Sequence, residues 1–90
     1  MQIECTFFGP LRDAVDEKTV VYDTDAETAG DLLRELENEY PNLRQLVDED
    51  ELADGIAVTI NKRHLSSRDG LSTTLADGDV VRLTTAVYGG

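Results

Sequence analysis

A predicted helix between residues 28 and 40, with a clear start and a clear end in the sequence, constrains the fold of this chain more than any other feature. Thr28 stands three residues before Asp31, which resembles a capping box with Asp in the place usually taken by Glu or Gln. Apolar side chains then recur at helical spacing until Pro41 ends the helix. A helix with one apolar face must bury that face against another element. The apolar stripe consists of Ala29, Leu32, Leu33, Leu36 and Tyr40.

Four other segments have the pattern of strands, two before the helix and two after it. They alternate apolar and polar side chains or are rich in β-branched residues, as half-buried strands are. In the third segment only Ala57 and Thr59 separate the apolar residues, so we expect this strand at the centre of the sheet. The four strands span residues 2–7, 19–23, 56–60 and 80–84, and His64-Leu65 is a candidate short edge strand.

This order predicts an α+β fold of two layers, in which a four- to five-stranded mixed sheet carries one main helix across it. Sequential strands are usually neighbours, so the first two are expected to pair in antiparallel fashion. A last strand inserted beside the first, and parallel to it, completes a ubiquitin-like β-grasp. We expect this domain to span residues 1–85 and to be followed by a flexible tail, residues 86–90, that ends in Gly-Gly.

Three connecting segments carry weaker signals. Residues 11–15 are expected to form one helical turn after Gly9-Pro10 interrupts the first strand, and residues 41–47 a second short turn. The like-charge run at residues 48–51 should repel itself and stay in solvent, and it lacks the glycine and the spaced ligands of a calcium loop. On the main helix, the off-stripe carboxylates are expected to form a solvated face. They are Glu35, Glu37 and Glu39.

The chain is strongly acidic. Nineteen acidic residues against eight basic ones give a formal net charge of -11, and the only lysines are Lys18 and Lys62. Nucleic acids and anionic membranes would be repelled, so we expect neither as a partner. Low lysine and high acid content favour a salt-rich cytoplasm, as in a halophile, over an ordinary acidic protein. The start of the chain does not have the pattern of a signal peptide, and no apolar run is long enough for a membrane span.

Residues that commonly carry catalysis are few. Cys5 is the single cysteine, which excludes an internal disulfide framework, and it is expected to be a small apolar residue of the first strand. His64 is the single histidine and lies in a polar turn region, where we assign it no Cys or Ser as a catalytic partner, so we expect a surface role. The carboxylates are too scattered to nominate an acid and base pair. We therefore expect no catalytic residue, no metal and no bound cofactor.

The chain resembles a known family along its whole length. Residues 7–13, Phe-Phe-Gly-Pro-Leu-Arg-Asp, are similar to the strand end and loop of the small subunit of molybdopterin synthase. Residues 28–36 resemble its capped helix, residues 41–43 the segment after it, and residues 77–80 the turn before its last strand. Combined with Gly89-Gly90, the resemblance is to the sulfur-carrier and small archaeal modifier branch of the ubiquitin-like superfamily.

One departure from the family bears on function. The synthase subunit commonly has a proline-rich stretch before its final glycines, whereas residues 84–88 of this chain are Thr-Thr-Ala-Val-Tyr. The prolines that would stiffen the tail for one synthase partner are absent. The leading hypothesis is therefore a more general protein modifier, with sulfur transfer as the alternative.

The resemblance implies that an ATP-dependent activating enzyme adenylates the carboxylate of Gly90. A lysine of a target protein could then attack to form an isopeptide bond, or sulfur could attack to leave a thiocarboxylate. Gly89 and Gly90 have no side chain to clash in an enclosed active site. Val87 and Tyr88 offer apolar anchors to a partner, although Tyr88 could equally fold back on the domain.

Three functions remain open from the sequence. The first is a modifier joined to target lysines. The second is a sulfur carrier for tRNA thiolation or for molybdopterin synthesis, where the partner would be the large subunit of the synthase. The third is a non-covalent interaction module with incidental glycines. We expect a monomer, with Lys62 in a turn and Lys18 as the two side-chain amines through which the protein could itself be modified.

Overall fold

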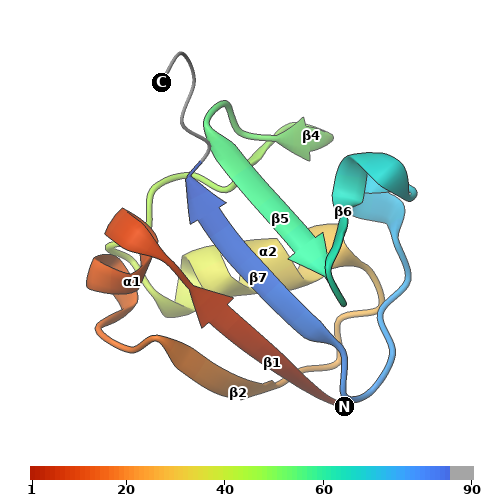
Figure 1. The fold of residues 1–90 in the computed structure, drawn as a ribbon, viewed down its shortest axis with the longest axis horizontal. Helices are drawn as coiled ribbons and strands as arrows, with labels where there is room; N and C mark the ends of the chain where they lie inside the picture. Colours follow the sequence, from red (N-terminus) through yellow and green to blue (C-terminus); the bar gives the residue numbers. More distant parts are fainter. Residues whose placement is uncertain (86–90) are drawn as a thin grey trace.

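A five-stranded sheet with the main helix packed across one face forms the body of the protein (Figure 1). The computed structural model describes residues 1–85. In chain order the elements are β1 (Gln2–Phe7), α1 (Gly9–Val15), β2 (Thr19–Asp23), α2 (Ala29–Glu39), β3 (Val47–Asp48), β4 (Glu51–Leu52), β5 (Ile56–Ile60), β6 (Arg63–His64), the 3-10 turns η1 (Leu65–Ser67) and η2 (Gly70–Ser72), and β7 (Val80–Thr85).

The strand order β2-β1-β7-β5-β6 confirms the predicted β-grasp. Strands β1 and β7 run parallel, and every other neighbouring pair in this sheet is antiparallel. The prediction that residues 56–60 form the central strand is wrong, because β7 lies at the centre. Uncharged Ala57 and Thr59 made β5 look more enclosed than β7, whose middle residue, Arg82, lies opposite Thr59 on the face away from the core.

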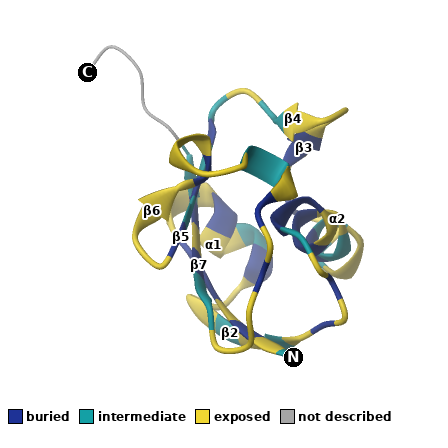
Figure 2. Ribbon diagram, turned by 90° about the vertical axis from the view of Figure 1, so that its right-hand side faces the viewer, coloured by how far each residue is buried: buried dark blue, intermediate teal, exposed yellow. Residues whose placement is uncertain are grey.

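The apolar core lies between the sheet and α2. Figure 2 shows the buried side of α2 turned toward the sheet and its exposed side turned away. Thr28 caps the helix as predicted, since its Oγ1 accepts a hydrogen bond from the Asp31 amide at 3.3 Å. The ring of half-buried Tyr40 meets that of Phe7 edge-on, with 6.1 Å between centroids. The fully enclosed core includes Ile3, Cys5, Phe7, Leu32, Leu33, Leu36, Leu46, Val58, Ile60, Leu65, Val81 and Leu83.

Helix α1 is longer than the single turn predicted for residues 11–15. It begins at Gly9, and Pro10 fits its first turn because the amide hydrogen that proline lacks has no partner there in any helix. The helix ends at Asp16, which adopts the left-handed conformation with φ of 67°. The short edge strand is also displaced by one residue from its prediction, to Arg63–His64.

The predicted helical turn at residues 41–47 is not present. The chain instead forms a β3–β4 hairpin in which Val47 pairs with Leu52. Glu37 of α2 holds the start of this hairpin, because its Oε2 accepts hydrogen bonds from the amides of Leu46 (2.7 Å) and Val47 (3.4 Å). The run at residues 48–51 is exposed, as expected, but it belongs to the hairpin rather than to a loop.

The expectation that the off-stripe carboxylates of α2 are only a solvated face is therefore wrong for two of the three. Besides Glu37, Glu35 accepts a hydrogen bond from the hydroxyl of buried Thr24 at 2.7 Å. Glu39 is exposed. Glu35 thus joins α2 to a side chain just after β2, and Glu37 joins it to the backbone at the start of β3. Helical spacing does not disclose either contact.

Replacing Glu37 with Ala should lower the free energy of unfolding by about 1–3 kcal/mol, because the amide of fully buried Leu46 loses its acceptor. Urea denaturation monitored by circular dichroism gives this quantity. Glu39→Ala, two residues away on the same helix, is the matched control and should stay within about 0.5 kcal/mol of the parent. Equal effects of the two substitutions would contradict a specific role for Glu37.

Candidate functional site

The predicted site residues Val87, Tyr88, Gly89 and Gly90 lie outside the described residues. The description ends at Thr85, the last residue of β7 and thus of the central strand. Thr85 is still paired with Ile56 of β5, and on the other side the amide of Phe8 donates to the carbonyl of Leu83 at 3.0 Å. The surface around this end of the sheet is therefore the part of the body nearest to the predicted tail.

The face of the sheet opposite α2, here called the outer face, is the one turned toward the viewer in Figure 1. Register places one side chain from each strand in a row across it. This row has three threonines, one arginine and one histidine, and Thr84 and Ala57 form a second pair closer to the tail. None of these side chains is a carboxylate. The row is Thr19, Thr6, Arg82, Thr59 and His64.

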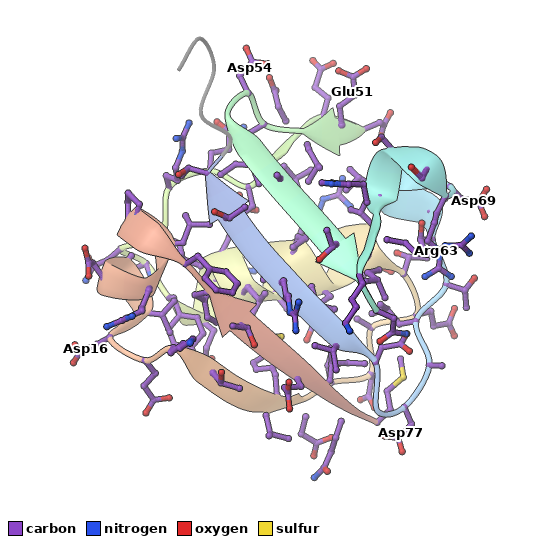
Figure 3. The ribbon with its side chains drawn as sticks, viewed as in Figure 1. Asp16, Glu51, Asp54, Arg63, Asp69 and Asp77 are labelled. Carbon is purple, nitrogen blue, oxygen red and sulfur yellow. The ribbon has the colours of Figure 1, made fainter. Side chains whose placement is uncertain are left out.

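The absence of carboxylates on this row stands out in a chain with 19 acidic residues among 90. The acidic positions of the outer face, Glu4 and Asp23, lie at the end of the sheet away from Thr85. Figure 3 shows other carboxylates around the rim of the same view, including those labelled on Asp16, Glu51 and Asp54. Arg82 therefore occupies the centre of an area without carboxylates, which has acidic residues around much of its rim.

Both lysines adjoin this area. The ammonium group of Lys18 lies 5.9 Å from the centroid of the Phe8 ring, within the range of a cation–π contact, and Phe8 is 37% exposed. Lys62 is exposed in the two-residue turn between β5 and β6, where Asn61 and Lys62 both have positive φ. With Val80 and Arg82 these two residues line a shallow hollow of about 210 Å³. The outer face thus has three cationic groups at its centre and margins.

The sequence could have located Arg82, although the residue was not singled out. Within β7 the apolar side chains of Val81 and Leu83 enter the core, so Arg82 between them must point to the opposite face. What the sequence does not disclose is which strands lie beside it. That depends on the register of β1, β5 and β7, which brings Thr6 and Thr59 to either side of Arg82.

Cys5 is not a candidate nucleophile. It is fully buried in β1, and burial, with a smaller contribution from the charge of Glu4, raises the pKa of its thiol from 9.0 to about 12. The thiolate is the reactive form of cysteine, so the group is inert at neutral pH. His64 is exposed in β6, as expected for a surface residue. Among residues 1–85 no group of three or more His, Cys, Asp or Glu side chains could hold a metal ion.

Burial of Cys5 predicts a specific pH dependence. Between pH 9 and about 12 the unfolded chain releases the thiol proton while the folded chain keeps it. The free energy of unfolding should therefore fall as pH rises, by up to about 1.4 kcal/mol per pH unit from this group. Below pH 9 the thiol is protonated in both states and contributes no slope.

Denaturation of the parent and Cys5→Ala at pH values on both sides of 9 measures this contribution. Every other group is common to the two proteins, so the difference between their slopes isolates Cys5. The alanine variant should be less stable at neutral pH but should lose less stability in alkali. Parallel pH curves for the two proteins would contradict the buried, neutral thiol.

Comparison with known proteins identifies the family. The profile described as the ThiS family matches residues 5–90, which is nearly the whole chain. The chain belongs to the ThiS family. It is 37% identical over 92 residues to small archaeal modifier protein 3 of Haloferax volcanii, with all of both chains covered. One full-length relative of this ThiS-family chain is thus a modifier protein.

Two solved structures of relatives agree with the fold of this ThiS-family chain. The crystal structure of SAMP1 from Haloferax volcanii matches with a TM-score of 0.80 and 32% identity, and all of both chains is covered. The crystal structure of the BexX/CysO complex from Amycolatopsis orientalis matches with a TM-score of 0.81 and 26% identity, covering 98% of this chain and 99% of the other. The suspected relationship to small archaeal modifiers and sulfur carriers is thereby confirmed.

The relatives are small modifier and carrier proteins rather than catalysts, in agreement with the expectation for this chain. In the part of the chain that the structure describes, no helix is long and apolar enough to cross a membrane.

Proposed function

We propose that this protein is a ubiquitin-like modifier, activated by adenylation at Gly90 and joined through it to lysines of target proteins by an isopeptide bond. The observation that carries this proposal is full-length similarity to small archaeal modifier protein 3 in a chain that itself ends in Gly-Gly. The β-grasp fold supports it, because the central strand ends at Thr85, five residues before Gly90.

The chemistry requires a separate activating enzyme. A free α-carboxylate has a pKa of about 3.3–3.7, so Gly90 is ionised in the cell and is a poor acyl donor. Attack of the carboxylate on the α-phosphorus of ATP releases pyrophosphate and leaves an acyl-adenylate. A neutral lysine amine then attacks the carbonyl carbon, AMP leaves, and the amine loses a proton. ATP is thus a co-substrate of the enzyme and not a cofactor of this protein.

The outer face fits the role of the surface that the activating enzyme holds. Five extended residues span at most about 17 Å, so an enzyme that has Gly90 in its active site must also be close to the body near Thr85. There the body presents the row without carboxylates, with Arg82 at its centre. A partner surface with a carboxylate opposite Arg82 would meet attraction there and repulsion from the acidic rim, which fixes its orientation.

Sulfur transfer is the second candidate. It is supported by membership of the ThiS family and by similarity to CysO in its complex with BexX. In this case a sulfur nucleophile would displace AMP from Gly90 and leave a thiocarboxylate, for tRNA thiolation or for the large subunit of a molybdopterin synthase. The absence of proline from residues 84–88 favours modification, the broader use of the adenylate.

Mass spectrometry of a tagged form recovered from its native cells separates these functions. After chymotryptic cleavage behind Tyr88, modification leaves Gly-Gly remnants on lysines of other proteins, whereas trypsin, which cuts behind Arg82, would leave residues 83–90. Sulfur transfer leaves free protein with one oxygen replaced by sulfur. Exposed Lys18 and Lys62 are candidate acceptors for modification of this protein itself. We expect this activity in the cytoplasm, at high salt. Retention of all partners and cellular roles after deletion of Gly89-Gly90 would instead favour a non-covalent interaction module.

Replacing Gly90 with Trp should abolish adenylation, because the new side chain has no room in a site built for glycine. ATP–pyrophosphate exchange by the purified activating enzyme measures the reaction. The melting temperature should stay within about 2 °C of the parent, since the substituted position follows the last described strand by five residues. Exchange at the parental rate would contradict activation at Gly90.

Replacing Arg82 with Glu should lower kcat/KM for adenylation about tenfold at low salt, equivalent to about 1.4 kcal/mol, and less at high salt. Arg68→Glu is the matched control, because it makes the same change of net charge at an exposed position between η1 and η2. If both variants lost activity equally, net charge rather than the outer face would govern the encounter.

A further inference from the structure

Strand β2 forms one edge of the sheet, and its hydrogen-bonding pattern fixes which backbone groups point outward. Met1 and Thr24 exchange both backbone bonds, at 3.0 and 2.9 Å, and the Phe7 amide donates to the Lys18 carbonyl at 2.7 Å. In an antiparallel ladder such pairs recur at every second residue, so Val20 and Tyr22 also bond to β1. The amides and carbonyls of the residues between them point away from the sheet. These are Thr19, Val21 and Asp23.

This edge is open to solvent over the length of the strand. All three residues with outward backbone groups are exposed, and Val21 is 62% exposed, more than the other large apolar side chain on the described surface, Phe8. Figure 1 shows β2 at the lower border of the sheet, with β1 as its neighbour in the strand order. Five uninterrupted residue pairs join it to β1, and the strand contains no proline.

Such an edge is unusual because proteins normally protect it. An exposed, regular edge strand is a template for pairing with another chain, and natural sheets block it with proline, bulges, covering segments or charges within the strand. Here the charged residues, Lys18 and Asp23, stand only at the two ends. The centre, Val20-Val21-Tyr22, has the β-branched and aromatic composition that favours strand pairing.

The side of this edge that faces α2 is acidic. Tyr22 is half-buried there, and burial first, then the charges of Glu35 and Glu39, raise the pKa of its hydroxyl. At the end of the strand, Asp23, Thr24, Asp25 and Glu35 line a hollow of about 280 Å³. A strand added beside β2 would therefore have carboxylates near its α2-facing side chains, next to Tyr22 and the end of β2. Its other face would lie beside exposed Val21.

We propose that the edge of β2 accepts an extended segment of a partner protein as a sixth strand of the sheet. Backbone pairing with Thr19, Val21 and Asp23 provides affinity, and side-chain alternation provides selectivity. The segment has Lys or Arg at positions that face α2, where they meet Glu35 and Glu39. Between them it has apolar β-branched residues, one of which packs beside Val21. This inference does not rest on the proposed function, because it concerns the edge of the sheet and not the tail.

A second copy of this chain is a poorer occupant. Two bodies of formal charge -11 repel each other, and pairing their β2 edges would bring Glu35 and Glu39 of both copies toward the same seam. A cationic strand instead neutralises these groups. The charge of the edge therefore selects a basic partner segment, and self-pairing is an outcome that the experiment must distinguish.

The test uses the full-length protein labelled with 15N and two synthetic nine-residue peptides, one alternating Lys with Val and one alternating Glu with Val. At low salt the Lys peptide should shift and protect from hydrogen exchange the amides of Thr19, Val21 and Asp23. The Glu peptide should bind at least about tenfold more weakly. Shifts centred on Arg82, or equal binding of the two peptides, would overturn the proposal.

Val21→Pro removes the central outward amide, and proline is tolerated on an edge strand where the missing hydrogen would face solvent. This variant should lose binding of the Lys peptide while the amides of β1 keep their protection. Val21→Thr is the matched control, because it retains the amide and should still bind. Unchanged binding by Val21→Pro would exclude strand addition.

A second variant keeps the proposal testable if Val21→Pro does not fold. Glu35→Gln combined with Glu39→Gln retains an acceptor for Thr24 and should weaken the Lys peptide about tenfold. Analytical ultracentrifugation of the unliganded protein completes the test. A dimer that Val21→Pro dissociates would assign the edge to a second copy and overturn the proposal.

Discussion

The parallel pairing of β1 with β7 is the contact on which the rest of this fold depends. It joins the beginning of the chain to residues near its end, with Cys5 opposite Val81 and Phe7 opposite Leu83. Without it the sheet would separate into the β2–β1 pair and the three strands β7, β5 and β6, and α2 would have no continuous apolar surface to cover. Strand β7 is thus the last element in the sequence, and its central position closes the core.

A polar cluster fixes where β7 begins. The side chain of Asn61 accepts a hydrogen bond from the Val80 amide and donates one to Asp79, both at 2.9 Å. On the other side, Asp77 accepts from the Gln2 amide at 2.7 Å. These bonds hold the start of β7 to β5 and to β1 before the apolar alternation begins. A slip of one residue would turn Val81 and Leu83 out of the core and Arg82 into it, so this cluster also determines the composition of the outer face.

Much of the fold could be predicted from local patterns, because its main elements have strong ones. The cap at Thr28, the leucine stripe and the alternation in β1 lead to the observed helix and strands, and chain order leads to the β-grasp. The errors arise where contacts between distant segments determine the local structure or the strand order. The β3–β4 hairpin depends on Glu37 of α2. The central place of β7 depends on its pairing with distant strands, and the charge of Arg82 makes β7 look less enclosed than it is.

The candidate site divides in the same way. Gly90 and its neighbours could be predicted from sequence, and stay a prediction, because their proposed chemistry is in the backbone and in their position at the end of the chain. The row around Arg82 and the acidic border of β2 could not be predicted, because each combines side chains from several strands or from a strand and α2. A surface of this kind exists only in the assembled sheet.

The central strand also has a mechanical consequence. A pull on Thr85 along β7 acts in shear on two ladders at once, with four residue pairs to β1 and five to β5. In this geometry the backbone bonds share the load and must fail together, whereas a pull across an edge strand opens them one after another. A protein attached through its carboxyl end would thus resist extraction from that end more strongly than its small core suggests.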